Sequence, residues 1–177
     1  MVMTGLFLKA GQRDLSSSTL PFSPSWCHAY GWERTASLRI SSNAFPEGGL
    51  LPSTYTYSAA NINPSLCIKG LPRTTRSLLV VLEHRNAPIA PRTHWLCWDL
   101  PPLQEIRSGE QRGKLGRNDF LINGYTGPLG QPFSGSFCFI VFALRRALHL
   151  PMGASRYQAQ RSLAAELLAV GELPFFA

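Results

Sequence analysis

The residues with the clearest chemical potential lie between positions 84 and 128. His94 belongs to an apolar run that favours a buried strand, the turn Ala87-Pro88 precedes it, and a Gly-Tyr-x-Gly-Pro sequence follows at residues 124–128. Proline and glycine turns hold loops in fixed shapes, and an imidazole with a pKa of about 6.5 can carry a positive charge. The combination is typical of the wall of a small anion pocket, although a histidine in an apolar strand can equally be a core residue.

Other chemistries find less support in the sequence. It has no Gly-x-Ser-x-Gly elbow, no His-Glu-x-x-His motif and no phosphate-binding Walker loop. Asp119 is expected to accept backbone N–H groups rather than to act as a base. Alternation along a strand places His94 on the face of Leu96 and Trp98 and Cys97 on the opposite face, a poor arrangement for a metal. We predict no catalytic residue, metal ligand or cofactor, and an enzyme would need a serine or cysteine within hydrogen-bond reach of His94.

The charge of the chain limits its partners. Lys and Arg total 17 against 10 Asp and Glu, a formal net charge of +7, and arginine predominates. Arginine suits bidentate contacts with phosphate or carboxylate. The basic residues are scattered, only Arg145 and Arg146 are adjacent, and no basic run is interleaved with exposed aromatics, so we predict no nucleic-acid partner. We also predict no transmembrane segment, no signal peptide, free thiols and a cytoplasmic location.

Short strands must position these residues. The 14 prolines and 15 glycines favour many turns and few long helices. Residues 77–82 and 136–144 are continuously apolar, which is typical of strands buried on both faces. Further strands are expected at residues 38–41, 54–57 and 94–98, and a helix is expected at residues 155–170 with apolar positions Leu163, Leu167 and Val170.

Residues 1–36 differ from the rest of the chain. They contain a serine-rich stretch and an aromatic cluster of Trp26, Tyr30 and Trp32. This composition predicts a partly disordered extension, followed by one domain at residues 37–177.

Several motifs, in their order along the chain, resemble the phosphatidylethanolamine-binding protein family, in particular its bacterial Raf-kinase-inhibitor-like branch. The matching elements are the Asn-Ile-Asn-Pro-Ser-Leu turn at residues 61–66, Ala87-Pro88, His94-Trp95, Asp119 and residues 124–128. The resemblance covers about residues 38–176. It implies a mostly-β fold of two packed antiparallel sheets, a β-sandwich, with a C-terminal helix. It also implies a shallow pocket for phosphate-type or carboxylate anions.

The polar residues of the family's pocket are changed in this chain. The family's two aspartates fall at His84 and Asn86, and its His-Arg-Tyr strand falls near residues 135–137, so a second histidine and an arginine are missing. One hypothesis is that His84 partly replaces the histidine missing at Gly135. The other is that the pocket has lost its function and His84 merely ends a strand. The replacement hypothesis requires the rings of His84 and His94 to lie within about 6 Å, two hydrogen-bond lengths.

We therefore expect a non-enzymatic protein that binds a small anionic group, either phosphate, a phospholipid headgroup or an acidic or phosphorylated side chain of a partner protein. Modulation of a kinase or another enzyme is a role that the resemblance implies. The expected ligand-binding residues are His84, Asn86, Pro88, His94, Tyr125, Gly127 and Pro128. The alternative is a protein-interaction module on the same scaffold with a vestigial pocket. Its marker would be exposure of Trp26, Tyr30 and Trp32, whereas packing of these rings over the pocket mouth would indicate an occluded site.

Overall fold

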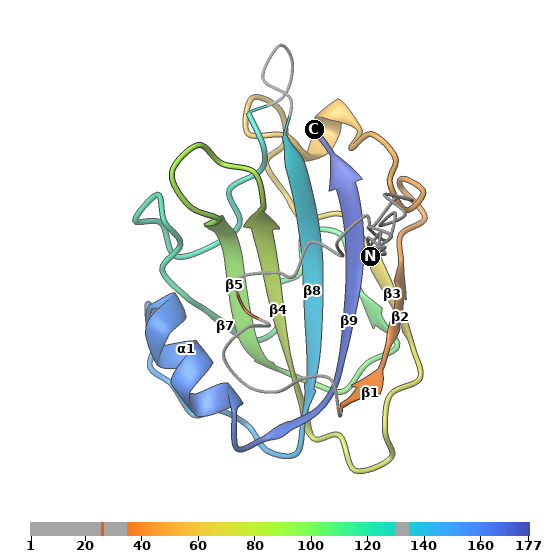
Figure 1. Ribbon diagram of the computed structural model, residues 1–177, viewed down its shortest axis with the longest axis vertical. Coiled ribbons are helices and arrows are strands. Elements are labelled where there is room, and N and C mark those ends of the chain that lie inside the picture. The colour runs from red at the N-terminus through yellow and green to blue at the C-terminus, as the bar shows by residue number, and fades with distance from the viewer. Residues whose placement is uncertain (1–25, 27–34, 130–134) are drawn as a thin grey trace, which may run out of the picture.

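The computed structural model describes Trp26 and residues 35–129 and 135–177, which form two packed β-sheets and one α-helix (Figure 1). The larger sheet has the strand order β1-β9-β8-β4-β5-β7 and the smaller one β2-β3-β6. All strand pairs are antiparallel except β1 with β9. The elements are β1 (Ala36–Ser37), β2 (Arg39–Ser41), the 3-10 helix η2 (Ser53–Tyr55), β3 (Leu66–Lys69), β4 (Ser77–His84), β5 (Arg92–Leu100), β6 (Glu105–Ile106), β7 (Lys114–Leu115), β8 (Ser136–Leu144), α1 (Arg156–Leu163) and β9 (Leu167–Phe176). The expected mostly-β sandwich with a helix near the C-terminus is confirmed.

Two apolar layers cover the two faces of the larger sheet. Strand β8 shows the pattern most clearly, because its side chains alternate between the layers from Phe137 to Leu144. Phe137, Phe139 and Val141 lie in the layer between the two sheets. Their neighbours in sequence lie in the outer layer, which includes Ala159 and Leu163 of α1. The predicted central strands at residues 77–82 and 136–144 are confirmed as β4 and β8, each buried on both faces.

The expected helix at residues 155–170 is wrong in its second half. The expected start is right, because Ser155 caps α1 in a capping box with Gln158, but the helix ends at Leu163. Leu167 and Val170 belong to β9, which pairs with β8 along its whole length. Every second residue of β9 from Ala169 faces the layer between the sheets, and a side chain at Gly171 would meet the Leu38 carbonyl oxygen at 2.6 Å. The helical spacing of Leu163, Leu167 and Val170 suggested a helix, although the residues from Ala169 onward alternate with the period of two that is typical of a strand.

The expected strand at residues 54–57 is also wrong, because the chain forms η2 there instead. The backbone N–H and the hydroxyl of Thr56 both donate to the Ser53 carbonyl oxygen, at 3.0 and 2.7 Å. Tyr57 then bonds the Pro128 carbonyl oxygen at 2.8 Å. Local hydrogen bonds of this kind compete with strand pairing in segments rich in serine and threonine.

Of the aromatic cluster predicted in the N-terminal extension, the structure describes Trp26. Residues 1–25 and 27–34 lie outside the described part, and with them the aromatics Tyr30 and Trp32. Ala36, the last residue assigned to the extension, lies in β1 and pairs with Ala169 of β9. Trp26 is described and fully buried, with its ring centroid 5.8 Å from that of Phe142 in the outer layer. Trp26 is thus neither exposed nor placed over the pocket that the motifs predicted.

Two further predictions concern the thiols and membrane-spanning segments. Cys67, Cys97 and Cys138 are free thiols, as predicted, and Cys27 lies outside the described residues. None of the described helices has the length and apolar character needed to cross a membrane.

Candidate functional site

A cavity of about 260 Å³ opens where β4 ends and β5 and β8 begin. We call it the histidine cavity. It is lined by His84, Ala87, Pro88, Arg92, His94, Phe120, Leu129, Gly135 and Phe137. Three of the predicted site residues, His84, Pro88 and His94, therefore meet around one space. Arg92, Phe120 and Phe137 were not among the predicted site residues, and only the position of Arg92 beside His94 could have suggested its part.

A β-bulge directs the His94 side chain into this cavity. In the pairing of β4 with β5, Leu82 faces Trp95 and Glu83 faces Thr93, so that His94 is the extra residue. Its ring lies 5.3 Å from that of Phe137, which belongs to the layer between the sheets, as Trp95 does. The prediction that alternation puts His94 on the face of Leu96 and Trp98 is therefore wrong. Bulges of this kind redirect side chains and are common beside functional sites.

The bulge also corrects the relation between His94 and Cys97, which the same alternation placed on opposite faces. Cys97 lies in the layer between the sheets, on the side to which His94 is turned. Its sulfur contacts the Arg112 carbonyl oxygen at 3.7 Å, and burial raises the pKa of its thiol to about 12. The described residues contain no cluster of three metal-ligating side chains.

A buried network fixes the His94 ring from the side away from the cavity. Its Nδ1 lies 2.8 Å from the Thr126 carbonyl oxygen. Asn118, which is 2% exposed, donates from Nδ2 to the carbonyl oxygen of His94 at 3.0 Å and to the Thr126 hydroxyl at 2.8 Å. Asn118 was not predicted as a site residue, although it stands beside Asp119, which the sequence comparison singled out. It is a positioning residue, because it holds the loop that orients the imidazole.

Asp119 braces the start of β5. Its carboxylate accepts the Thr93 backbone N–H at 2.7 Å, and its own N–H donates to the Thr93 carbonyl oxygen at 3.0 Å. The prediction that this carboxylate accepts backbone N–H groups is confirmed.

His84 occupies the space that a side chain at position 135 would take. A Cβ on Gly135 would lie 2.5 Å from His84 Nε2. The His84 ring stacks on Phe137 at 4.3 Å between centroids and lies 5.9 Å from the His94 ring at an interplanar angle of 71°. The two imidazoles therefore meet the distance condition of about 6 Å set for the replacement hypothesis.

Asn86 holds His84 in place. Its Oδ1 accepts the Ser136 backbone N–H at 2.7 Å and lies 3.1 Å from His84 Nε2. The amide thus links the end of β4 to the start of β8, and its connection to the cavity is through the imidazole.

The remaining predicted residues support the cavity from outside its wall. The Tyr125 hydroxyl donates to the Tyr55 carbonyl oxygen at 3.0 Å, and Gly127 donates its N–H to Asn61 Oδ1 at 2.8 Å. A Cβ on Gly127 would meet the Tyr55 carbonyl oxygen at 2.4 Å, and Pro128 accepts the N–H of Tyr57. Direct ligand contact by Tyr125, Gly127 and Pro128 stays a prediction.

Arg92 supplies the positive charge of the histidine cavity at neutral pH. Burial lowers the pKa of His94 to about 4, an effect that nearby His84 reinforces and that the Thr126 and Gly127 carbonyls and Asp119 partly oppose. Burial is also the main cause of the lowered pKa of His84, and Arg92 adds to it. Both imidazoles are therefore neutral near pH 7. No carboxylate is among the described residues that line the cavity.

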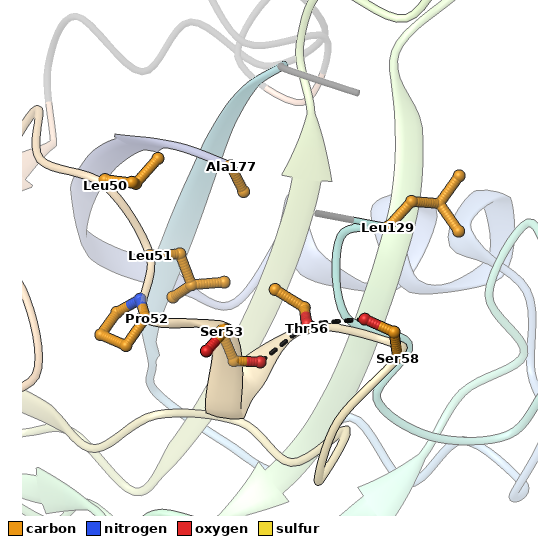
Figure 2. Close-up of a pocket in the computed structure, with 8 residues that line it drawn as sticks. All are labelled: Leu50, Leu51, Pro52, Ser53, Thr56, Ser58, Leu129 and Ala177. Atoms are coloured by element: carbon orange, nitrogen blue, oxygen red, sulfur yellow. Dashed lines mark hydrogen bonds between the residues drawn. The ribbon is translucent and has the colours of Figure 1, made fainter. Parts of the chain in front are cut away.

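Two apolar hollows adjoin the histidine cavity through Leu129, which lines all three spaces. The first, of about 480 Å³, has Leu50, Leu51 and Ala177 on one side and Leu129 on the other, with Thr56 bonded to Ser53 and Ser58 between them (Figure 2). The second, of about 350 Å³, is lined by Tyr57, Phe120, Ile122, Thr126, Gly127 and Leu129. Since neither hollow contains a charged side chain among these residues, we place the candidate site at the histidine cavity.

A nucleophile beside His94 would indicate an enzyme. Within the described part of the chain, His94 makes its side-chain hydrogen bond to a carbonyl oxygen, and no serine or cysteine bonds its ring. Ser136, near the cavity, is bound through its backbone N–H to Asn86, and Ser134 lies outside the described residues.

The chain is similar to known proteins over most of its length. The sequence pattern of the family described as phosphatidylethanolamine-binding protein matches residues 41–175. A UPF0098 protein of Pyrococcus horikoshii is 35% identical over 154 residues, which are 81% of this chain and 77% of the relative. A UPF0098 protein of Aquifex aeolicus is 33% identical over 144 residues, 76% of this chain and 84% of the relative.

Two crystal structures share the fold. A phosphatidylethanolamine-binding protein homologue from Chlamydia trachomatis has a TM-score of 0.75 at 23% identity, over 81% of this chain and 98% of that one. The E. coli protein YbcL, described as a member of the mammalian family, has a TM-score of 0.71 at 24% identity, over 80% of this chain and 98% of its own. At these identities the likeness concerns the fold alone.

Proposed function

Since this chain belongs to the phosphatidylethanolamine-binding protein family, we propose that it binds a small anionic group in the histidine cavity without converting it chemically. The group is phosphate, a phospholipid headgroup, or an acidic or phosphorylated side chain of a partner, and its occupancy modulates a kinase or another enzyme. The free thiols of Cys67, Cys97 and Cys138 support the cytoplasm as the place of action.

The observation that carries the proposal is the charge of the cavity wall. Arg92 is exposed at the start of β5, with the imidazoles of His84 and His94 beside it and no carboxylate among the described lining residues. A guanidinium binds phosphate or carboxylate through two parallel hydrogen bonds. A volume of about 260 Å³ suits a phosphate-sized group better than a whole lipid.

A two-dimensional NMR titration with phosphate and phosphorylethanolamine tests the proposal. We expect saturable shifts at His84, His94 and the start of β5. Arg92→Ala removes a charge-assisted hydrogen bond and should weaken binding about tenfold. Arg145→Ala is the matched control, because Arg145 is an exposed arginine beyond the opposite end of β8. The absence of any shift at millimolar ligand, or equal effects of the two variants, would refute the proposal.

A protein-interaction role on the same scaffold remains a second candidate. Trp26, part of its expected marker, is buried, so the support comes from another surface. Leu121 is 78% exposed, Leu129 is 57% exposed, and Phe120 and Ile122 are also exposed beside the histidine cavity. Exposed apolar groups gathered in one place are typical of contact surfaces.

The two candidates differ in which residues they require. Leu121→Asp should abolish association with a protein partner from the source cell while leaving phosphate shifts intact, and Arg92→Ala should do the reverse. Quantitative comparison of the proteins that co-purify with each variant makes the distinction. If both variants keep the protein partners and the phosphate affinity of the unaltered protein, Leu121 has no role in protein association and Arg92 has none in anion binding.

A further inference from the structure

The hydrogen bond of His94 determines which of its ring nitrogens carries the proton. Nδ1 lies 2.8 Å from the Thr126 carbonyl oxygen, and a carbonyl oxygen can only accept. In the neutral ring the hydrogen is therefore on Nδ1 and the lone pair on Nε2. The direct hydrogen bond of the ring to a described residue is the one at Nδ1, and the Gly127 carbonyl lies near enough to favour the charged ring. Nε2 is therefore the nitrogen left for a ligand in the cavity that the imidazole lines.

His84 is fixed in a comparable way through Asn86. The atom of Asn86 that faces its ring also accepts the Ser136 backbone N–H at 2.7 Å, so it is the amide oxygen. His84 Nε2, at 3.1 Å from this oxygen, must then be the donor, and the lone pair of the neutral ring lies on Nδ1. Both neutral imidazoles thus keep an acceptor as their remaining nitrogen.

The groups around His94 set the balance between its neutral and charged forms. His84 and the burial of the ring disfavour the imidazolium, and Asp119 and the carbonyls of Thr126 and Gly127 favour it. Arg92 lies on the same cavity wall and disfavours a charge on His84. Near pH 7 the wall therefore presents one cationic donor, Arg92, and neutral imidazoles whose free nitrogens accept.

Building on the proposed anion site, we propose that the histidine cavity selects anions that carry their own acidic hydrogen, namely phosphate monoesters, over proton-free sulfate and phosphodiesters. The P–O–H of the monoester donates to Nε2 of His94, and its unprotonated oxygens accept from Arg92. A diester or a sulfate places only lone pairs against the lone pair of Nε2, and it binds well only after His94 has taken up a proton. Phosphorylated small molecules or side chains are thus preferred over lipid headgroups, whose phosphate is a diester.

Proton linkage makes this selectivity measurable. A monoester with a second pKa of about 6 falls from roughly nine-tenths monoanion at pH 5 to roughly one-tenth at pH 7. Its affinity should therefore fall about tenfold over this range. The imidazolium fraction of a histidine with a pKa of about 4 falls about a hundredfold over the same range. Sulfate and diester affinities should follow that steeper fall.

Isothermal titration calorimetry with methyl phosphate, dimethyl phosphate and sulfate at pH 5, 6 and 7, at constant ionic strength, tests the proposal. Methyl and dimethyl phosphate differ by the one methyl group that removes the acidic hydrogen. We expect methyl phosphate to bind at least tenfold more tightly than dimethyl phosphate at pH 7, with a smaller difference at pH 5. Equal affinities or equal pH slopes would overturn the selectivity and leave the anion site standing. Failure of all three probes to bind at any pH would overturn both.

A substitution separates His94 from the rest of the cavity. The amide of His94→Gln can donate a hydrogen at any pH, so this variant should lose the preference for methyl phosphate and the steep pH dependence of sulfate binding. His149→Gln, which changes an exposed histidine beyond the far end of β8, should leave both unchanged. Retained discrimination in His94→Gln would contradict the proposal.

A measurement on the unaltered protein covers the case in which His94→Gln does not fold. The ¹⁵N chemical shifts of the His94 ring at pH 7 should report a hydrogen on Nδ1 and a lone pair on Nε2 in the free protein. Methyl phosphate should move the Nε2 signal toward the hydrogen-bonded or protonated range. The opposite tautomer in the free protein would overturn the proposal.

Discussion

At the scale of single residues, His84 at the end of β4 and Gly135 before β8 depend on each other, because the His84 ring fills the space beside Gly135 in the cavity wall. The imidazole stacks on Phe137, the residue of β8 that pairs with His84. Sequence comparison with the family showed both changes separately. That they belong together follows from the 2.5 Å approach of a Cβ on Gly135 to His84 Nε2, which only three-dimensional structure reveals.

Gly135→Ala should displace the His84 ring from Phe137. Its Cβ would also approach the Phe137 ring at 2.9 Å, so the free energy of unfolding should fall by about 1–2 kcal/mol. The double variant Gly135→Ala/His84→Ala should destabilise less than the sum of its single changes, because the clash with the His84 ring is absent. Urea unfolding of the four proteins in the cycle measures this coupling. Additive effects would show that the two positions do not compete for space.

The buried His94 should make stability fall in mild acid. Its pKa in the folded chain, about 4, lies below the unfolded value of 6.5, so the folded state binds its proton less readily. The stabilisation is complete above pH 6.5 and is lost as the pH falls toward 4. Between pH 7 and 4.5 this histidine should remove about 2 kcal/mol from the free energy of unfolding.

Urea unfolding at the two pH values in the unaltered protein and in His94→Gln isolates this contribution from those of other acidic and basic groups. The drop between pH 7 and 4.5 should be smaller in the variant. His149→Gln serves as the control for the loss of an exposed histidine. An identical drop in all three proteins would mean that folding leaves the pKa of His94 unchanged.

At the scale of elements, continuous apolar runs predicted the central strands, whereas departures from regular strand pairing could not be read from the sequence. Strands β4 and β8 follow the apolar runs that predicted them, because both are covered on both faces. The bulge at His94 and the change from helix to strand between α1 and β9 depend on pairing with β4 and β8, residues distant in sequence. Three predicted residues therefore reached the cavity wall, while the direction of His94 and the parts of Phe120 and Phe137 required the structure.

Asn118 should control the loop that follows β7. Its Oδ1 accepts the backbone N–H groups of Phe120 and Ile122, both at 3.0 Å, and its Nδ2 donates to the carbonyl oxygens of His94 and Gly124. Asn118→Ala leaves these buried groups without partners and should destabilise the protein by about 2–4 kcal/mol.

Hydrogen exchange gives the more specific measurement, since amides 120 and 122 should lose protection before those of β4. A substitution of the neighbouring exposed Arg117 to Ala provides the control. Uniform loss of protection across the sheet in Asn118→Ala would contradict a local role for the amide.

At the scale of the whole molecule, the two faces of the larger sheet have separate tasks. The face toward the smaller sheet ends in the histidine cavity, whereas the outer face is covered by α1 and Trp26. On the outer side, buried Glu83 forms an ion pair with Arg156 at 3.0 Å, and the Arg156 guanidinium lies 5.2 Å from the centre of the Trp26 ring. A tryptophan of the predicted N-terminal extension thus packs against a buried ion pair of the main domain.

Trp26→Ala should therefore destabilise the fold without changing the anion site. Removing a fully buried indole from the outer layer should lower the free energy of unfolding by about 3–5 kcal/mol, and more water should reach the pair of Glu83 and Arg156. Methyl phosphate affinity at 10 °C, where the variant stays folded, should match that of the unaltered protein, because the cavity lies on the opposite face. Trp26→Phe is the matched control, since it retains the contact with Phe142 and should recover most of the stability. Unchanged stability in Trp26→Ala would show that the outer layer closes without the N-terminal region, and weakened anion binding would show that the two faces are coupled through β4.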